Sequence, residues 1–328
     1  MNKITCNIFF LFFCCLFCIT VFPKIDESRL EKMKIFYKDL PVLVTGGAGF
    51  IGSHLTDKLV ELGAKVTVID DLSNGKIENL KNVIDKITFI KKSIVDKDVC
   101  MQATEGKAVI FHLAAIASVP RSLKYPNLYK NINIDGIYNL LDAARFNYVP
   151  RFVFSSSSSV YGPKEEKYQE DMKCFPLSPY GASKLIGELF CDQFSKHFGV
   201  KSIVLRYFNV FGDRQNPNGE YAAVIPKFKK LMEQNLPLPV YGDGLQTRDF
   251  TPVERVVEAN LVVAMIDYSN EKNIFNIGTG KSINILQVID MLKQEFPNYT
   301  NKIDFKPPRQ GDARHTCADC SRYDNLKV

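Results

Sequence analysis

The chain has 328 residues, of which 46% are hydrophobic and 24% are charged. This composition excludes a collagen, an intrinsically disordered chain and a small disulfide-stapled scaffold. The 42 Lys and Arg residues nearly balance the 36 Asp and Glu residues, and no run of basic residues stands out. Charge therefore gives no support to nucleic-acid binding. A chain of this length is expected to form two domains, or one domain with a large insertion.

An apolar segment lies close to the N-terminus. Residues 8–22 are almost wholly apolar, with Lys3 before them and Lys24 after them. The segment is shorter than the roughly 20 residues that span a bilayer, and it is typical of a secretory signal or a signal anchor. The alternative is a dispensable leader upstream of a start at Met33. We assign residues 1–32 to a leader outside the fold and expect a cytoplasmic protein, with membrane or secretory targeting through residues 8–22 left open.

The nine cysteines do not form the pattern of a disulfide framework. Four of them lie in the first 18 residues, and the other five are scattered. Cys317 and Cys320 form an isolated C-x-x-C, which we interpret as two packing residues. The four histidines are not paired at metal-ligand spacing. We therefore expect no metal site.

From residue 41 onward, strands alternate with helices. Short apolar runs predict strands at residues 41–45, 66–70, 87–90, 108–113, 151–155 and 201–206. The spacing of apolar residues predicts helices at residues 53–62, about 129–146, and about 179–198. This alternation predicts an α/β fold, with a doubly wound parallel sheet covered by helices on both faces. After residue 206, Pro and Gly become frequent, which indicates a smaller C-terminal domain.

A glycine-rich turn joins the first predicted strand to the first predicted helix. Its glycines are Gly46, Gly49 and Gly52, in the pattern G-x-x-G-x-x-G. Glycines permit a tight turn and a close approach of the backbone, and the following helix offers unpaired N–H groups to a pyrophosphate. Asp70 ends the second strand, at the spacing from which an acid reaches ribose hydroxyls. Because a carboxylate would repel a 2′-phosphate, the pattern favours NAD over NADP.

A tyrosine and a lysine lie one helical turn apart in the helix predicted at residues 179–198. Tyr180 and Lys184 form Y-x-x-x-K, so the phenol and the ammonium share one helical face. The ammonium and a positive nicotinamide ring are both expected to favour the phenolate and to lower the pKa of Tyr180. Serines 155–159 end the preceding strand, where parallel strands face the ligand crevice. One of these hydroxyls can bridge a substrate oxygen and the phenolate.

These motifs resemble those of the extended short-chain dehydrogenase/reductase family, and within it the nucleotide-sugar 4-epimerases. The resemblance runs from about Pro41 to the C-terminus. It implies a Rossmann-type NAD-binding domain at residues 33–206, to which residues 250–278 return. It also implies a nucleotide-sugar-binding domain formed by residues 207–249 and 279–328.

The resemblance also implies the residues of the site. Ser157, Tyr180 and Lys184 are expected to be catalytic. The expected NAD contacts are Gly46, Gly49, Phe50, Ile51, Gly52, Asp70, Ile94, Ala114, Tyr180, Lys184 and Tyr207. The expected substrate contacts are Ser118, Ser157, Asn209, Val224, Tyr241, Arg248, Arg309, Asp312 and Thr316. Two arginines suit one pyrophosphate, because a guanidinium fork fits phosphate oxygens.

The resemblance implies C4 epimerisation of a UDP-sugar through a 4-keto intermediate, with NAD retained because there is no net redox change. A small residue at Thr316 leaves room for a 2-N-acetyl group, and the segment around Ser118 resembles the N-acetylhexosamine branch. UDP-GlcNAc/UDP-GalNAc is therefore the expected pair, with UDP-glucose/UDP-galactose as a second. Helices at residues 129–146 and 180–198 are expected to form a homodimer interface.

Other activities on the same fold remain alternatives. The dehydratase and decarboxylase branches carry acids where Ser158 and Ser159 stand, and the absence of these acids favours an epimerase. A UDP-glucuronate 4-epimerase, or a dehydratase or decarboxylase with a different acid, stays open. A non-catalytic NAD-binding regulator is disfavoured, because this chain has both Tyr180 and Lys184. Ser93 stands where the family has an acid that touches adenine.

Overall fold

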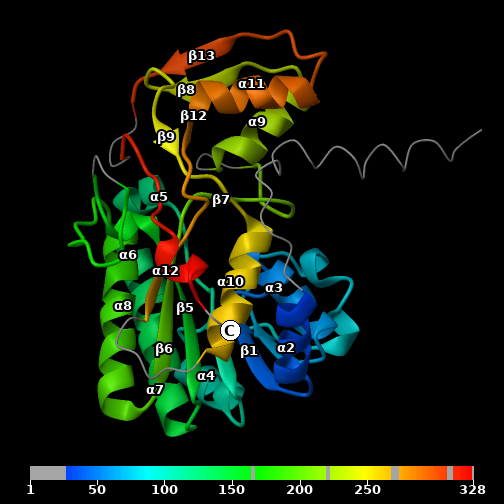
Figure 1. Ribbon diagram of the computed structural model, residues 1–328, viewed down its shortest axis with the longest axis vertical. Coiled ribbons are helices and arrows are strands. Elements are labelled where there is room, and N and C mark those ends of the chain that lie inside the picture. The colour runs from blue at the N-terminus through cyan, green and yellow to red at the C-terminus, as the bar shows by residue number, and fades with distance from the viewer. Residues whose placement is uncertain (1–26, 164–166, 219–221, 267–272, 309–312, 327–328) are drawn as a thin grey trace, which may run out of the picture.

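A parallel sheet of seven strands forms the centre of the molecule, in the order β11-β6-β5-β4-β1-β2-β3 (Figure 1). The computed structural model describes residues 27–163, 167–218, 222–266, 273–308 and 313–326. The strands of this sheet are β1 (Pro41–Thr45), β2 (Lys65–Ile69), β3 (Thr88–Ile90), β4 (Val109–His112), β5 (Arg151–Ser157), β6 (Lys201–Tyr207) and β11 (Ile274–Ile277). All neighbouring pairs are parallel. The α/β fold expected from the sequence is confirmed.

Helices cover both faces of this sheet (Figure 1). One face packs against α2 (Glu27–Tyr37), α3 (Phe50–Glu61) and α10 (Val253–Met265). The other packs against α4 (Lys97–Thr104), α7 (Gly136–Phe146) and α8 (Pro179–Phe198). The central strands are buried on both sides, which is why they appear in the sequence as continuous apolar runs rather than alternating ones.

Helix α8 has the bounds that the sequence predicts. The Ser178 side chain caps its N-terminus by accepting a hydrogen bond from the backbone N–H of Gly181, at 3.1 Å. Pro179 follows as the first helical residue, where its missing N–H costs nothing. Gly199 ends the helix with a left-handed φ of 72°, a conformation that glycine adopts without strain. These signals fix where Tyr180 and Lys184 stand.

A smaller lobe lies beyond the carboxyl ends of the main strands, at the top of Figure 1. It contains α9 (Val224–Glu233), β8 (Leu238–Tyr241), α11 (Ile285–Glu295) and β13 (Ile303–Lys306), which enclose their own apolar core. Short pairs link the lobes: β7 (Val210–Phe211) with β10 (Thr251–Pro252), and β9 (Thr247–Arg248) with β12 (Ile283–Asn284). Between β10 and β12, the chain returns to the main sheet through α10 and β11. The division into two domains stays a prediction.

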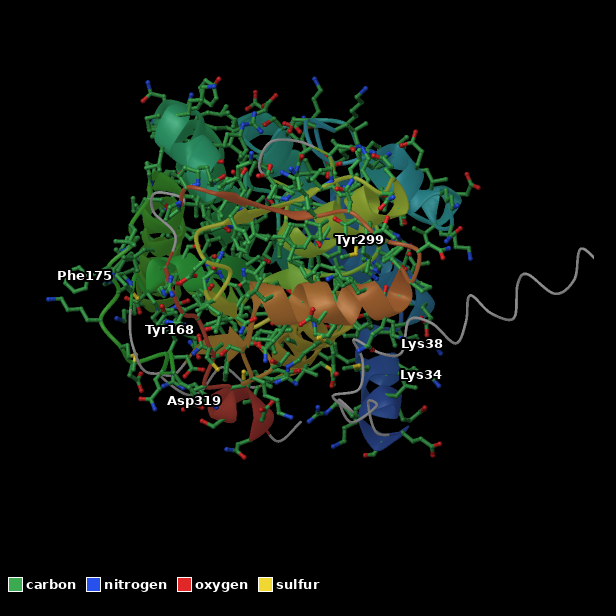
Figure 2. The ribbon with its side chains drawn as sticks, turned by 90° about the horizontal axis from the view of Figure 1, so that it is seen from above. Lys34, Lys38, Tyr168, Phe175, Tyr299 and Asp319 are labelled. Carbon is green, nitrogen blue, oxygen red and sulfur yellow. The ribbon has the colours of Figure 1, made fainter. Side chains whose placement is uncertain are left out.

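Helix α2 begins inside the segment that the sequence analysis assigns to a leader. Met33 and Tyr37 are fully buried, and Leu30 packs against the same core. Arg29 forms an ion pair with Glu258 of α10 at 3.2 Å. Residues 27–32 are therefore part of the folded unit, and the assignment of all of residues 1–32 to a leader is wrong at its C-terminal end. Lys34 and Lys38, at the C-terminal end of α2, are labelled in Figure 2.

Some of the expected residues cannot be placed. Residues 8–22, Arg309 and Asp312 lie outside the described residues, so what the sequence predicts for them stays a prediction. Among the helices that the structure describes, none combines the length and the apolar character needed to cross a bilayer.

The helix predicted at residues 129–146 is divided. Short helices α5 (Val119–Lys124) and α6 (Pro126–Tyr129) lead into a π-helical segment, Lys130–Asp135, before α7 begins at Gly136. Pro126 starts α6, because proline is tolerated at a first helical position. Such π turns are common at functional sites. A search for apolar residues at the α-helical spacing of about 3.6 residues does not detect them.

Candidate active site

A cavity of about 790 Å³ opens at the carboxyl ends of the main strands, where the strand order reverses at β1. In open α/β sheets, ligands bind at this switch point. Every residue that the sequence analysis expects to contact NAD lines the cavity, namely Gly46, Gly49, Phe50, Ile51, Gly52, Asp70, Ile94, Ala114, Tyr180, Lys184 and Tyr207. The fold thus brings together residues that follow β1, β2, β3 and β4 with residues of α3, α8 and β6.

The glycine turn leaves no room for side chains. Gly46 has a φ of +71°, and a Cβ on it would lie 2.8 Å from the backbone of Ala114. A Cβ on Gly52 would lie 2.1 Å from the carbonyl oxygen of Gly46. The backbone therefore folds closely on itself at the N-terminus of α3, where Gly46, Gly49 and Gly52 line the cavity. A pyrophosphate fits this cradle, because helix N-termini attract anions.

Asp70 holds this turn and also faces the cavity. Its carboxylate accepts a hydrogen bond from the N–H of Ala48 at 2.9 Å and another from the N–H of Leu72 at 2.9 Å. Burial raises the pKa of this carboxyl, and the two backbone hydrogen bonds oppose that shift. The oxygens keep further lone pairs for a ligand. A ribose diol bound in the cavity would donate to them.

Tyr180 lies in the first turn of α8 and is only 9% exposed. Burial raises the pKa of its phenol, and a hydrogen bond with Ser157 acts in the opposite direction. The expectation that the lysine lowers this pKa is not met in the protein alone, because burial is the larger effect. The edge of Tyr129 packs against the Tyr180 ring, with the ring centroids 6.3 Å apart.

Lys184 lies one turn further along the same face of α8. Its ammonium donates a hydrogen bond to the carbonyl oxygen of Ser155 at 2.7 Å and lies over the Phe154 ring, 5.0 Å from the centroid. Burial lowers the pKa of Lys184 to about 8, although the Glu188 carboxylate opposes the shift. The group is thus fixed at the end of β5, within the cavity wall that also holds Tyr180.

The serines at the end of β5 have different partners. Ser155 exchanges a hydrogen bond of 2.9 Å with the Tyr207 hydroxyl, which also accepts from Asn260 of α10 at 2.8 Å. Ser156 donates to the Glu188 carboxylate. Ser157 accepts from the N–H of Ser159 at 3.2 Å. Of the three, Ser157 is the one whose hydroxyl lowers the pKa of the Tyr180 phenol.

A second cavity of about 230 Å³ adjoins the first, since Ala222 and Ala223 line both. Asn209, Val224, Tyr241 and Arg248, all expected to contact substrate, line this smaller cavity. Ser118 lines the larger one. Thr316 is buried beside Asn209, with the two side-chain oxygens 3.4 Å apart. The placed residues of the expected substrate set therefore lie in or beside the two cavities, or, for Ser157, beside Tyr180.

Asn133, in the π-helical segment, is a buried residue of the site that was not expected from the sequence. Its Nδ2 donates to the Ser183 hydroxyl of α8 at 3.0 Å and to the carbonyl oxygen of Ile116 at 3.1 Å. Its Oδ1 accepts from the N–H of Ile116 at 2.9 Å. Asn133 thus ties α8 to the loop that follows β4 and that lines the larger cavity. A buried asparagine within an apolar helical pattern was the available signal.

The arrangement places a buried phenol, an ammonium and a hydroxyl beside a dinucleotide cradle. This suits enzymes that pass the hydride of an alcohol carbon to a dinucleotide and the proton of its oxygen to a base. The model of the NAD dependent epimerase/dehydratase family matches residues 42–278. The chain belongs to this family, and the resemblance to its nucleotide-sugar 4-epimerases is confirmed. NAD is its cofactor, as expected.

The chain is similar to several epimerases along most of its length. A putative UDP-glucose 4-epimerase of Methanocaldococcus jannaschii is 36% identical over 87% of this chain and 92% of that protein. The structure of a UDP-N-acetylglucosamine 4-epimerase from Methanobrevibacter ruminantium M1, in complex with UDP-N-acetylmuramic acid, is 39% identical with a TM-score of 0.82, over 88% of this chain and 93% of the other. A UDP-glucuronic acid 4-epimerase from Bacillus cereus, in complex with UDP-glucuronic acid and NAD, is 33% identical with a TM-score of 0.79, over 88% and 92%.

Proposed function

We propose that this NAD-dependent UDP-sugar 4-epimerase acts mainly on the pair UDP-GlcNAc/UDP-GalNAc, with UDP-glucose/UDP-galactose as a second pair. The observation that carries the proposal is the pair of adjoining cavities. One contains Tyr180, Lys184 and the glycine turn, and the other contains Asn209 and Arg248. A nucleotide diphosphate held in the smaller cavity leaves its sugar at the larger one.

Each side chain of the site has a role in this reaction. Tyr180 takes the proton from the sugar 4-hydroxyl and returns it after the 4-keto sugar has turned over. Ser157 bonds to the same sugar oxygen and to the phenol, and Lys184 contributes the positive charge that favours the phenolate. When bound, NAD supplies the hydride acceptor and donor for C4. Arg248 and Asn209 anchor the nucleotide, so that binding energy from the inert end positions the reacting end.

The size of Thr316 supports an N-acetylhexosamine. Its side chain is short and lies beside Asn209, so it leaves more space for a 2-N-acetyl group than an aromatic residue would. The second candidate is UDP-glucuronate. Arg121 favours it, because this residue supplies a cation on the wall of the larger cavity, where Ser118 also lies. A uronate needs such a charge near its C6 carboxylate.

Product analysis tests the proposal directly. The purified chain is incubated separately with UDP-GlcNAc, UDP-glucose and UDP-glucuronate without added cofactor, and the products are resolved by chromatography. We expect UDP-GalNAc from UDP-GlcNAc at a higher kcat/KM than for either other sugar. A strong preference for UDP-glucose or UDP-glucuronate would overturn the sugar assignment, and a dehydrated or decarboxylated product would overturn epimerisation. Tyr180→Phe is the matched control, which should bind nucleotide and give no product.

We also propose that the enzyme is a homodimer through α7 and α8. These helices expose large apolar side chains to solvent, including Tyr138, Phe146, Leu189 and Phe198. Contiguous exposed apolar surface of this kind marks interaction sites. Sedimentation equilibrium should give twice the chain mass, and Leu189→Glu should shift the protein to the monomer. A wild-type monomer at micromolar concentration would contradict the proposal.

A further inference from the structure

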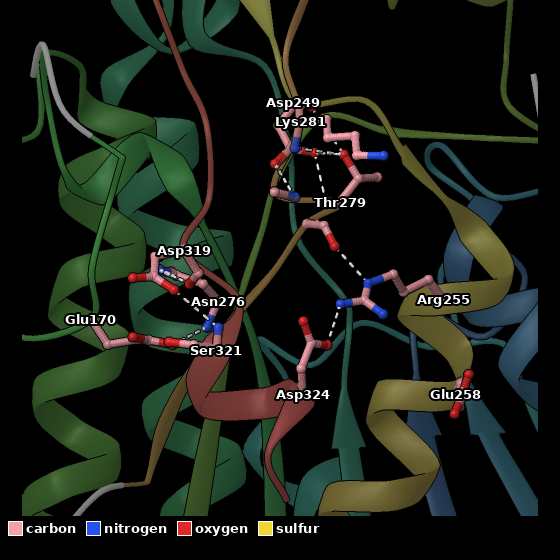
Figure 3. Close-up of polar contacts among 12 residues, drawn as sticks. Glu170, Asp249, Arg255, Glu258, Asn276, Thr279, Lys281, Asp319, Ser321 and Asp324 are labelled. Atoms are coloured by element: carbon pink, nitrogen blue, oxygen red, sulfur yellow. Dashed lines mark hydrogen bonds and ion pairs between the residues drawn. The ribbon is translucent and has the colours of Figure 1, made fainter. Parts of the chain in front are cut away.

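Asp249 is a fully buried carboxylate that the reaction does not use. Its two chain neighbours, Arg248 and Phe250, both line the smaller cavity, whereas its own side chain bonds to other parts of the chain. It accepts hydrogen bonds from the N–H and the hydroxyl of Thr279, at 2.8 Å and 2.6 Å (Figure 3). It also accepts from the N–H groups of Gly280 and Ala318, both at 3.0 Å.

These donors come from two segments that are far apart in the sequence. Thr279 and Gly280 follow β11, the edge strand of the main sheet. Ala318 belongs to the C-terminal segment that begins at residue 313 among the described residues. The single carboxylate of Asp249 therefore ties the wall of the smaller cavity to both the main sheet and the C-terminal segment.

The C-terminal segment carries Thr316 only two residues before Ala318. The N–H of Thr316 donates to the carbonyl oxygen of Thr247 at 3.2 Å, so the segment runs beside β9. Further along, it runs beside Tyr168: the N–H of Tyr168 donates to Cys317, and the N–H of Asp319 donates back to Tyr168. Figure 2 labels Tyr168 and Asp319 on the same side of the molecule. Asp249 thus links the backbone next to Arg248 to the segment that carries Thr316.

We propose that Asp249 is a positioning residue that sets the distance between Arg248 and Thr316, and thereby the affinity for the nucleotide sugar and the choice between sugars. This inference rests on the proposed function, because it takes Thr316 as the residue that borders the sugar. An asparagine has the same shape, but its amide group turns a donor toward donors that need an acceptor. At least one buried N–H then loses its partner, and the segment that carries Thr316 shifts.

The structure offers a matched control on the same segment. Asp324 of α12 (Ser321–Asp324) bonds to Arg255 of α10 at 2.7 Å, and its side chain is 52% exposed. Arg255 also donates to the carbonyl oxygen of Gly278, next to Thr279 (Figure 3), and Asp324→Asn leaves both groups of that hydrogen bond in place. Asp324→Asn makes the same chemical change and removes the same charge, but it touches neither cavity lining.

The experiment compares full-length wild type, Asp249→Asn and Asp324→Asn. For each, kcat and KM are measured with UDP-GlcNAc and UDP-glucose, together with the NAD bound per chain. We expect Asp249→Asn to raise KM for both sugars about tenfold and to change the ratio of their kcat/KM values about fivefold, the scale of one buried hydrogen bond. Bound NAD and kcat should stay close to wild type, and Asp324→Asn should change none of these quantities.

The outcomes separate positioning from a general loss of structure. Unchanged KM and selectivity in Asp249→Asn would overturn the inference. An equal loss of kcat, of bound NAD and of kcat/KM for both sugars would also overturn it. If Asp249→Asn does not fold, Thr279→Val removes one of the four donors to Asp249, together with the bonds of the same hydroxyl to the backbone of Lys281. It should shift selectivity in a smaller step, and no shift overturns the inference. If the wild type turns over no UDP-sugar, the proposed function fails. The affinity for UDP, measured by calorimetry, then tests the role of Asp249. We expect weaker binding in Asp249→Asn than in wild type and Asp324→Asn, and equal binding in all three would contradict the role.

Discussion

Arg206 of β6 and Glu188 of α8 form an ion pair in which each side chain is only 4% exposed. The guanidinium makes two bonds to the carboxylate, 3.0 Å from Nε to Oε1 and 2.6 Å from Nη2 to Oε2. Glu188 lies one helical turn beyond Lys184, and it also accepts from the Ser156 hydroxyl at the end of β5. The pair therefore holds α8 against the two strands that carry Ser157 and Tyr207.

We expect Glu188→Gln to destabilise the fold by about 3–5 kcal/mol, because Arg206 then keeps a buried charge without its counter-charge. Thermal and denaturant unfolding measure the loss, and kcat should fall with it because α8 carries Tyr180. The double variant Glu188→Met with Arg206→Met should recover most of the stability, since a buried pair can be replaced by apolar residues at little cost. A single variant as stable as wild type would contradict this account.

Gly52→Ala is expected to abolish NAD binding. The new Cβ would lie 2.1 Å from the carbonyl oxygen of Gly46, so the turn must open. The NAD content of the purified protein and calorimetric titration measure the effect. Gly106→Ala is the control for backbone strain alone, because Gly106 has a φ of +65° that disfavours alanine, but a Cβ there meets nothing within 4 Å and Gly106 lines neither cavity. Retention of NAD by Gly52→Ala would show that the turn does not cradle the cofactor.

The pH dependence should follow Lys184. Its pKa is lowered to about 8, so the ammonium is present below that pH and is lost above it. We expect kcat to fall as the pH rises through about 8. The folded state binds fewer protons than the unfolded state between about 8 and 10.5, so the contribution of Lys184 to stability rises with pH across this window. A pH–rate profile tests the first statement and unfolding at several pH values the second.

Lys107 provides the control for this assignment. Burial lowers its pKa as well, but its ammonium bonds to the Thr67 hydroxyl at 2.7 Å, and Lys107 lines neither cavity. Lys107→Met should leave the alkaline limb of kcat unchanged. A limb that moves in this variant, or a wild-type kcat that stays level to pH 10, would count against Lys184.

Thr316→Tyr should shift the substrate preference of the enzyme from UDP-GlcNAc toward UDP-glucose. The aromatic ring would occupy the space beside Asn209, where we propose that the 2-N-acetyl group of the substrate lies. We expect kcat/KM for UDP-GlcNAc to fall about 100-fold while that for UDP-glucose stays within about fivefold, the scale of a steric exclusion in a pocket. Thr316→Ser is the control and should keep both sugars. Equal losses for both sugars would show that Thr316 does not border the N-acetyl group.

Much of the architecture could be predicted because it depends on local signals. Buried parallel strands appear as apolar runs, and α8 carries its cap, its proline and its terminal glycine within a few residues of sequence. The glycine turn and Asp70 follow from spacing alone. Since these residues come from neighbouring strand ends, their convergence on one cavity follows from parallel topology.

The remaining features depend on contacts between distant segments. The four hydrogen bonds to Asp249 and the bonds of Asn133 produce no periodic pattern in the sequence, because their partners lie in other parts of the chain. Helix α2 was not expected, because the apolar residues before it led us to place the start of the fold at residue 33 instead of residue 27. The pKa of Tyr180 could not be predicted, since the burial of its hydroxyl depends on the complete packing around α8.

Ala222 and Ala223 line both cavities. A ligand that moves these two residues on entering one cavity alters the shape of the other. Thermodynamic linkage then requires reciprocity: whatever factor a bound nucleotide contributes to the retention of the dinucleotide, the dinucleotide contributes to the nucleotide. Free uridine nucleotides should accordingly change the affinity of the enzyme for its cofactor, even though they carry no sugar to epimerise.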